Sequence, residues 1–368
     1  MSEAKGMGIF MRKRFEGKSI LIIGASGGLG ESYAGAFINE GGRLLLAGRN
    51  AEKLRVLADR LSGDVNIAVA DITDGKSVDE LAGFACQWSE KIDIVINATG
   101  YDVRKSLEDH EFYDIRKSLD TNLLGAILVT KAFLPYMKDE KGSTIVHMGG
   151  FADGHLAFPY YSVDVATRAG IFSFIEAMNR ELYQEGSKVS LTYFCPNAAD
   201  TVAEKPYHKI WQEMGIAISS TEQVASEVLK AIERQKTVYI MGGVPTRFFA
   251  HLNTLFPKLA DVLLLKKYSS ILKKYLSNST DKKVIKSKRK GIKKFAIGLV
   301  VLSFVFYALL PIVPFLNFDT KIKVAITAAM MGTSEVIFWV GGAILGKEIV
   351  AKYKRYINPV NWICCKKH

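Results

Sequence analysis

Cysteine is scarce in this chain, and its placement argues against two kinds of site. The 368 residues contain four cysteines, Cys86, Cys195, Cys364 and Cys365, whose spacing matches neither a metal-ligand set nor a disulfide framework. We therefore expect no metal site. Residues 1–18 are charged and lack an apolar core, so they do not predict a signal peptide, and we expect the larger part of the chain to stay in the cytosol.

Acidic residues are scarce in one stretch. The chain carries a formal net charge of +12, and residues 266–294 contain twelve Lys and Arg against a single acidic residue, Asp281. Such a run can bind nucleic acid, but the apolar stretch that follows it favours an anionic membrane surface. We therefore expect a membrane partner and no nucleic-acid partner.

Glycine, by contrast, is concentrated near the N-terminus. Residues 19–23 (SILII) are predicted to form a buried strand, GASGGLG follows at 24–30, and a helix is predicted from about Glu31. Glycines let the turn tighten and let the backbone approach a phosphate, and the helix N-terminus supplies free N–H donors. A glycine-rich turn between a strand and a helix therefore predicts a dinucleotide-binding site.

Strands and helices alternate up to about residue 243. Apolar strands are predicted at 43–47, 65–70, 93–96, 144–148, 189–194 and 238–241, with helices at 51–61, 112–137, 163–184 and 222–235. Strands that are apolar throughout and alternate with helices predict an α/β fold, a Rossmann-type doubly wound parallel sheet. Ligands of such sheets bind at the carboxyl ends of the strands.

Residues 17–243 resemble the short-chain dehydrogenase/reductase family. The resemblance rests on GASGGLG at 24–30, DIT at 71–73, NATG at 97–100, DTN at 120–122 and PNAADT at 196–201, in this order. It implies a single Rossmann domain that binds a nicotinamide dinucleotide. The resemblance assigns to the cofactor Gly24, Ser26, Gly28, Leu29 and Gly30 in the turn, Asp71 and Ile72 at the adenine, Asn97 and Gly100 at the ribose, Pro196, and Thr201 near the pyrophosphate and carboxamide.

The end of the second predicted strand indicates which dinucleotide binds. An acidic residue there accepts hydrogen bonds from a ribose 2′-hydroxyl, whereas a basic one accommodates a 2′-phosphate. The chain has Gly48, Arg49 and Asn50, and a guanidinium offers paired donors to a phosphate. This favours NADP(H), with a solvated Arg49 at the start of a helix as the alternative.

The residues that do chemistry in this family are largely replaced. The family uses a Ser, a Tyr, a Lys four residues later and an Asn on the preceding helix. The match from Ala169 onward puts Asp164 in the Tyr position and Arg168 in the Lys position, and Gly150 stands where the Ser belongs. Only Asn122 is retained. Arg168 can bind ribose hydroxyls or a phosphate but cannot relay a proton.

The identity of the proton donor is open at this point. Asp164 has an ordinary pKa near ~3.9, and Arg168 one helical turn away is expected to keep it ionised and unable to donate a proton. Tyr161 lies seven residues before Arg168 on the same helix face, a spacing that resembles fatty-acid enoyl reductases. Tyr161 is a donor candidate, with packing in front of the helix as an equal alternative. The catalytic candidates are therefore Asn122, Tyr161, Asp164 and Arg168, and weaker donors are Tyr160, His147 and His155.

The C-terminal third of the chain predicts a membrane anchor. Residues 295–315 and 324–345 are long and apolar enough to span a bilayer, and a turn near Asn317 makes them a helical hairpin. The basic residues around the hairpin place both of its ends in the cytosol. This tail also resembles a two-helix suffix found on various bacterial proteins. Glu335 lies mid-span and is expected to be protonated and bonded within the hairpin, where Ser303 and Tyr307 lie at a suitable depth. The alternative is that Glu335 faces a partner chain or a thinned, wet patch of membrane.

The stretch between the two predicted regions is amphipathic. From Val244 to Lys267 apolar residues recur at helical spacing, and Pro257 is predicted to break the run. The stretch is expected either to cover the sheet edge or to lie in a membrane interface beside the substrate mouth.

The predicted organisation has five parts. They are an N-terminal tail (1–17), a Rossmann NADP(H)-binding domain (18–243), an amphipathic helix with a basic linker (244–294), a transmembrane hairpin (295–346) and a basic tail (347–368). The predicted function is a membrane-anchored NADP(H)-dependent oxidoreductase that acts on a lipophilic carbonyl or enoyl substrate, and a homo-oligomer is a candidate assembly. The alternative is an inactive pseudoenzyme that binds NADP(H) as a sensor or scaffold.

Overall fold

The structure, a computed structural model, describes residues 13–137, 142–150, 156–277 and 297–345. The chain divides into two compact units, Met1–Ser277 and Asn278–His368. Most of the predicted N-terminal tail, the basic linker and the basic C-terminal tail lie outside the described residues.

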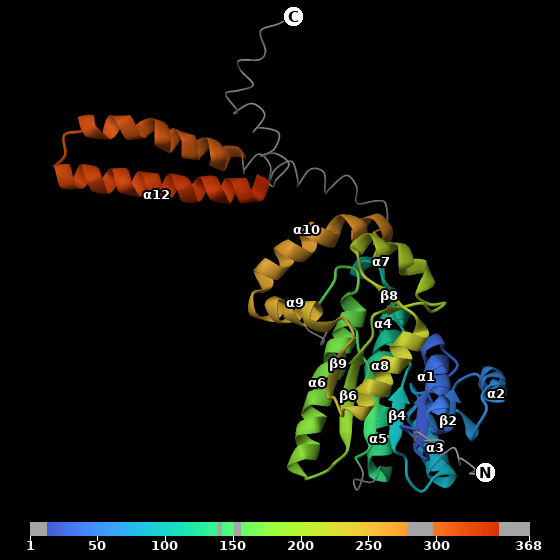
Figure 1. The fold of residues 1–368 in the computed structure, drawn as a ribbon. Coiled ribbons are helices and arrows are strands. Elements are labelled where there is room, and N and C mark those ends of the chain that lie inside the picture. The colour runs from blue at the N-terminus through green and yellow to red at the C-terminus, as the bar shows by residue number, and fades with distance from the viewer. Residues whose placement is uncertain (1–12, 138–141, 151–155, 278–296, 346–368) are drawn as a thin grey trace, which may run out of the picture. The chain divides into compact units, whose positions relative to one another are not determined.

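A seven-stranded sheet forms the centre of the first unit (Figure 1). Every neighbouring pair of strands is parallel, and the strand order reverses between β1 and β4, which is where ligands bind in such sheets. The predicted Rossmann-type sheet is confirmed. In spatial order the strands are β3 (Val65–Val69), β2 (Arg43–Gly48), β1 (Ser19–Ile23), β4 (Ile94–Asn97), β5 (Thr144–Met148), β6 (Ser190–Cys195) and β9 (Val238–Ile240).

Helices cover both faces of the sheet. Ile20 and Ile22 of β1 pack toward one face, and Leu21 and Ile23 pack toward the other, so both faces of this strand are buried. This is why the strand is apolar at every position. One face is covered by α1 (Gly28–Asn39), α2 (Ala51–Arg60) and α8 (Thr221–Glu233), the other by α3 (Gly75–Trp88), α5 (Gly125–Phe133) and α6 (Ser162–Gln184).

The helix predicted at 112–137 is not uniform. It consists of α4 (Phe112–Ser118), a π-helical turn (Leu119–Leu124), α5 and a 3₁₀ turn (Leu134–Tyr136). Turns of π-helix inside α-helices are frequent at functional sites, and this one carries Asn122.

A third apolar cluster caps the first unit beyond the N-terminus of α6. It joins Leu156, Phe158 and Tyr161 to side chains of α7 (His208–Met214), α9 (Gly243–Leu255) and α10 (Pro257–Leu276). Because α6 begins just after Tyr161, this cap lies at the carboxyl end of the sheet. The two helices α9 and α10 meet at Pro257, where the predicted break is confirmed. Two short strands, β7 (Ala198–Ala199) and β8 (Ile218–Ser219), pair beside α7.

The second unit contains two apolar helical segments. Its segments Ile297–Phe315 and Thr320–Val340 are long and apolar enough to cross a membrane, and the second belongs to α12 (Thr320–Leu345). Ser303 and Ser334 are fully buried, and the rings of Phe304 and Phe338 meet edge to face.

The expectation for Glu335 is wrong. Glu335 is exposed, and among the described residues it makes no hydrogen bond to Ser303 or Tyr307; Ser303 donates to the carbonyl of Val300 instead. The buried residue at this level of α12 is Ser334. The next residue along an α-helix lies about 100° further around it, because a turn holds 3.6 residues, so Glu335 points outward.

Candidate active site

The glycine-rich turn lies between β1 and α1, at the switch point of the sheet. Gly24 has a φ of +79°, a left-handed conformation that favours glycine. A Cβ on Gly30 would lie 2.3 Å from the carbonyl oxygen of Gly24, and one on Gly28 would lie 2.9 Å from Cγ2 of Thr201. Gly27 and Gly28 are exposed, so the first N–H groups of α1 are accessible to a phosphate.

Arg49 and Asp71 follow the neighbouring strands β2 and β3. Arg49 is exposed, and its charge reaches Asp71. Burial alone would raise the pKa of Asp71, but hydrogen bonds from the Thr73 N–H (3.0 Å) and hydroxyl (2.8 Å), together with Arg49, lower it. Ser26 lies nearby, since its Oγ is 3.7 Å from where a Gly48 Cβ would be. These polar groups fit the adenosine end of a dinucleotide.

Two other candidate cofactor-binding residues in this region make mainly packing contacts. Ile72 is buried, and its Cδ1 would lie 2.6 Å from a Cβ on Gly125. Leu29 is partly buried and packs against the same apolar cluster as α8. Their side chains shape the site rather than supply polar groups to it.

Asn97 ends β4 and is held by three polar groups. Its Oδ1 accepts a hydrogen bond from the Thr99 hydroxyl at 2.6 Å, and its Nδ2 lies 3.4 Å from Nδ1 of His147. The other ring nitrogen of His147 lies 2.8 Å from the Thr130 hydroxyl. Burial lowers the pKa of His147 to about 4, so the ring is neutral and positions Asn97. Its role is structural, and His155 lies outside the described residues.

Asn122 ties the loop after β4 to α6. Its Oδ1 accepts from the N–H of Tyr101 and its Nδ2 donates to the carbonyl of Tyr101, both at 2.8 Å. The same Nδ2 lies 3.2 Å from the Thr167 hydroxyl and 3.4 Å from Oδ1 of Asp164. The structure therefore brings Asn122 and Asp164 together, as the alignment of the helix predicts.

Arg168 completes this group. Its Nε donates to Oδ1 of Asp164 at 3.2 Å, and its Nη1 donates to the carbonyl of Met148, the last residue of β5, at 2.8 Å. Its Nη2 would lie 3.1 Å from a Cβ on Gly100. The guanidinium therefore spans the carboxyl ends of β4 and β5, the edge at which sheets of this kind bind their ligands.

The structure corrects the direction in which the pKa of Asp164 is expected to shift. Burial raises the pKa of Asp164, and Asp102 adds to the rise, while Arg168 opposes it without reversing it. Only 6% of the residue is exposed, so the cost of removing a carboxylate from water is larger than the attraction of one cation. Asp164 therefore keeps its proton to a higher pH than its spacing to Arg168 in the sequence predicts.

The absence of the family serine also has a structural reason. A Cβ on Gly150 would lie 2.6 Å from Cγ of Arg168, and a Cβ on Gly149 would lie 2.4 Å from the ring of Tyr193. The Tyr193 hydroxyl accepts a hydrogen bond from the Gly150 N–H at 3.0 Å. Arg168 and Tyr193 thus fill the space in which a serine side chain would stand.

A buried ionic cluster beside the site is not apparent from the sequence. Arg104, in the loop after β4, has only 6% of its side chain exposed and pairs with Asp102 at 2.7 Å. It also donates to Glu204 at 3.0 Å, which accepts from the indole of Trp211 at 3.0 Å. The guanidinium lies 4.0 Å from the ring centre of Tyr207. These contacts join residues about one hundred positions apart, which no local pattern reveals.

Tyr161 belongs to this cluster and to the cap. Its ring contacts Phe158 and Trp211, and Arg104 lies 5.3 Å from its centre. The ring is buried, and burial raises the pKa of the hydroxyl. Tyr160, directly before it, has a φ of +71°. Tyr161 therefore packs in front of the helix, whether or not it also reaches a substrate.

The segment after β6 closes the site above the glycine turn. Pro196 begins it, and Thr201 accepts from the N–H of Glu204 at 3.3 Å. Because a Cβ on Gly28 would touch Thr201, the segment rests on the turn, and Glu204 ties it to Arg104. The cradle of glycines, Arg168 and Thr201 fits a nicotinamide dinucleotide.

The comparisons with known proteins agree with this geometry. The sequence model described as short chain dehydrogenase matches residues 18–210. An uncharacterised oxidoreductase of Staphylococcus aureus (strain USA300) is 29% identical over 224 residues, which are 61% of this chain and 94% of that protein. An uncharacterised oxidoreductase of Staphylococcus epidermidis is 28% identical over 184 residues, 50% of this chain and 79% of that protein.

Solved structures share the fold. A short chain dehydrogenase/reductase from Burkholderia phymatum in complex with NAD has a TM-score of 0.60 at 20% identity, covering 67% of this chain and 95% of that one. A 3-ketoacyl-(acyl-carrier-protein) reductase from Brucella melitensis complexed with NADH has a TM-score of 0.56 at 22% identity, covering 61% of this chain and 96% of that one. With the family match over more than half of its length, this chain is an oxidoreductase-type member of the short-chain dehydrogenase/reductase family.

Proposed function

We propose that the protein is a membrane-anchored, NADP(H)-dependent oxidoreductase that reduces or oxidises a lipophilic carbonyl or enoyl substrate through an altered active site. The observation that carries the proposal is the group formed by Asn122, Asp164 and Arg168 beside an intact glycine cradle. A bound nicotinamide supplies or accepts the hydride. The chain must then supply cofactor binding, substrate orientation and a proton.

We assign the role of proton donor to Asp164. Both hydrogen bonds that hold it, from Asn122 and from Arg168, end on Oδ1, and we place the acidic proton on Oδ2. In carbonyl reduction this proton passes to the substrate oxygen as the hydride reaches the carbon, and Asp164 becomes a carboxylate. Arg168 then stabilises the new negative charge. Tyr161 is the alternative donor.

The lipophilic substrate class rests on the surroundings of this group. Phe158, Tyr161 and Trp211 belong to the apolar cluster of the cap at the same end of the sheet. We take the two apolar segments of the second unit as a membrane anchor, with both ends of the hairpin on the cytosolic side. The test is NADPH oxidation by the full-length protein with long-chain ketone and enoyl substrates, and sustained turnover is the expected result.

The choice of NADP(H) over NAD(H) rests on Arg49. Arg49→Asp is expected to reverse the preference, because it replaces a phosphate donor with a carboxylate that accepts from a ribose 2′-hydroxyl. Dissociation constants for NADPH and NADH, measured by nucleotide fluorescence, test this. The matched control is Arg55→Asp on α2, an exposed arginine that pairs weakly with Glu52. Equal affinities for the two dinucleotides before and after the Arg49 change would remove Arg49 from the site.

A second function is an NADP(H)-binding sensor without turnover. The space for the family serine is filled by Arg168 and Tyr193, which favours this reading. Tight NADPH binding without oxidation of any carbonyl or enoyl substrate would establish it.

A further inference from the structure

The helices α9 and α10 are apolar on two opposite sides. Their inner side packs in the cap through Ala250, Leu264 and Leu272. Their outer side carries a set of exposed apolar residues that we call the outer ridge. Its members are Val244, Phe248, Leu255, Phe256, Leu259, Val262, Leu263 and Leu265.

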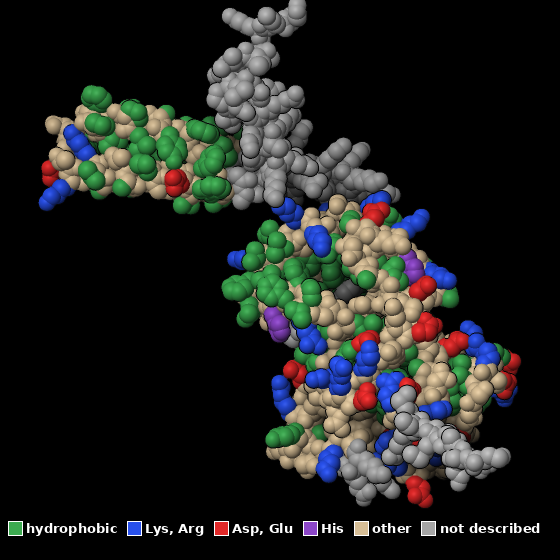
Figure 2. Space-filling model, viewed as in Figure 1, with side chains coloured by type: hydrophobic (Ala, Val, Ile, Leu, Met, Phe, Trp, Pro, Cys, Tyr) green, Lys and Arg blue, Asp and Glu red, His purple; other side chains and the backbone are tan. Residues whose placement is uncertain are grey.

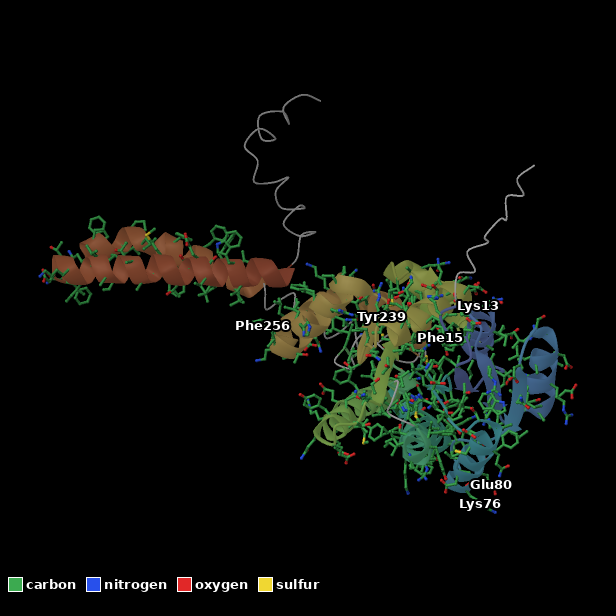
Figure 3. The ribbon with its side chains drawn as sticks, turned by 60° about the horizontal axis from the view of Figure 1, so that its bottom comes forward. Lys13, Phe15, Lys76, Glu80, Tyr239 and Phe256 are labelled. Carbon is green, nitrogen blue, oxygen red and sulfur yellow. The ribbon has the colours of Figure 1, made fainter. Side chains whose placement is uncertain are left out.

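The outer ridge is continuous over the surface. Figure 2 shows hydrophobic side chains gathered over α9 and α10, with basic side chains at their border, and Figure 3 places Phe256 at the corner between the two helices. Helices on a protein surface normally turn a polar side outward. A larger contiguous apolar patch marks a contact with another molecule or with a membrane.

The charged residues around the outer ridge indicate whether it contacts a membrane or another molecule. Arg247, Lys258, Lys266 and Lys267 are exposed on the same two helices, against one exposed acidic residue, Asp261. Lys274 is already paired, with Glu213 at 2.6 Å. Apolar residues flanked by Lys and Arg are the composition of helices that lie in the interface of an anionic bilayer.

The sequence keeps this surface within reach of a membrane. Helix α10 ends at Leu276, and the first apolar segment of the second unit begins at Ile297. A connection of this length spans at most ~70 Å even when fully extended. If the second unit is the anchor proposed above, this connection limits how far the outer ridge can move from the bilayer.

We propose that the outer ridge docks onto the anionic surface of the membrane in which the chain is anchored, an inference that rests on the proposed anchoring. The apolar side chains enter the interface and the lysines meet the lipid phosphates. The inner side of the same helices packs against Tyr161, Phe158 and Trp211. Docking therefore holds the apolar cap at the carboxyl end of the sheet against the bilayer.

The experiment is amide hydrogen exchange on the full-length protein in lipid nanodiscs. One set of discs contains phosphatidylcholine alone and the other adds phosphatidylglycerol. We expect amides of residues 244–265 to exchange about tenfold more slowly in the anionic discs, and we expect high salt to reduce this protection. The double variant Phe256→Ser/Val262→Ser should lose it.

The matched control is Phe84→Ser/Val56→Ser, which removes an exposed Phe and Val from helices α3 and α2. These residues are 42% and 49% exposed, against 60% and 62% for Phe256 and Val262. The control variant should keep the protection at residues 244–265. Loss of protection in both variants would attribute the effect to general destabilisation and overturn the proposal.

Other outcomes test the membrane anchor and the docking of the outer ridge separately. A protein that does not enter the discs at all contradicts the anchor itself. A protein that enters them but shows equal exchange at 244–265 in both lipids keeps the anchor and overturns the docking. Protection that appears in detergent and rises with protein concentration would assign the ridge to a second copy of the chain.

Discussion

Asp164→Asn is expected to lower turnover by about 10²–10⁴-fold while leaving NADPH binding unchanged. The amide has the shape of the carboxyl and can still accept the hydrogen bonds of Asn122 and Arg168, but it has no acidic proton to give. Single-turnover NADPH oxidation measures the loss, and nucleotide fluorescence measures the binding. A wild-type rate in this variant would exclude Asp164 as the donor.

The pH dependence of turnover tests the assignment of Asp164 as the proton donor independently. Burial raises the pKa of Asp164, so reduction requires the protonated form that exists below this raised pKa. Turnover should therefore fall as pH rises through it, and the fall should vanish in Asp164→Asn. Tyr161→Phe is the discriminating variant, because it abolishes turnover if Tyr161 donates the proton and changes mainly packing if Asp164 does.

Gly30→Ala is expected to abolish NADPH binding and to lower the free energy of unfolding by about 1–3 kcal/mol. The new methyl group would lie 2.3 Å from the Gly24 carbonyl oxygen and 2.8 Å from Cα of Ala25. Both are backbone atoms, so the turn can only relieve the overlap by opening, and this displaces the N–H groups aimed at the phosphates. Isothermal calorimetry and chemical unfolding measure the two effects.

Gly35→Ala is the matched control in the same helix. Apart from its chain neighbours and the nearby backbone of its own helix, no atom lies within 4 Å of where its Cβ would be. Alanine in a helix interior is more stable than glycine by up to ~1 kcal/mol, so this variant should bind NADPH normally and unfold at slightly higher denaturant. If Gly30→Ala binds NADPH as well as Gly35→Ala does, the nucleotide does not lie on this turn.

The central sheet is readable from the sequence because its signals are local. A strand such as 19–23 is apolar at every position, and the glycines after it are needed for turn geometry that the neighbouring residues set. Asn97, Asn122, Asp164 and Arg168 could be placed because the resemblance to the family assigns a position to each of them. Once the strands of the sheet are arranged correctly, these four side chains are expected to lie close together.

The pKa of Asp164 and the ion pairs of the site could not be predicted from local signals in the sequence. The pKa of Asp164 depends on how deeply the carboxyl is buried, which results from tertiary packing and not from the spacing to Arg168. The Arg104 cluster depends on contacts with Glu204 and Trp211, across about one hundred residues. The side chain of Glu335 could not be oriented because its depth in the hairpin does not fix which way it faces: neighbouring residues lie about 100° apart around a helix, and the buried residue is Ser334.

The filled space at Gly149 and Gly150 also constrains how this sequence can change over evolution. Serine at either position collides with Tyr193 or Arg168, and lysine at 168 still carries the Cγ that blocks position 150. A return to the family serine therefore demands that its neighbour be replaced or moved at the same time. Lineages that share this site should inherit glycine at 149 and 150, tyrosine at 193 and arginine at 168 as one covarying set.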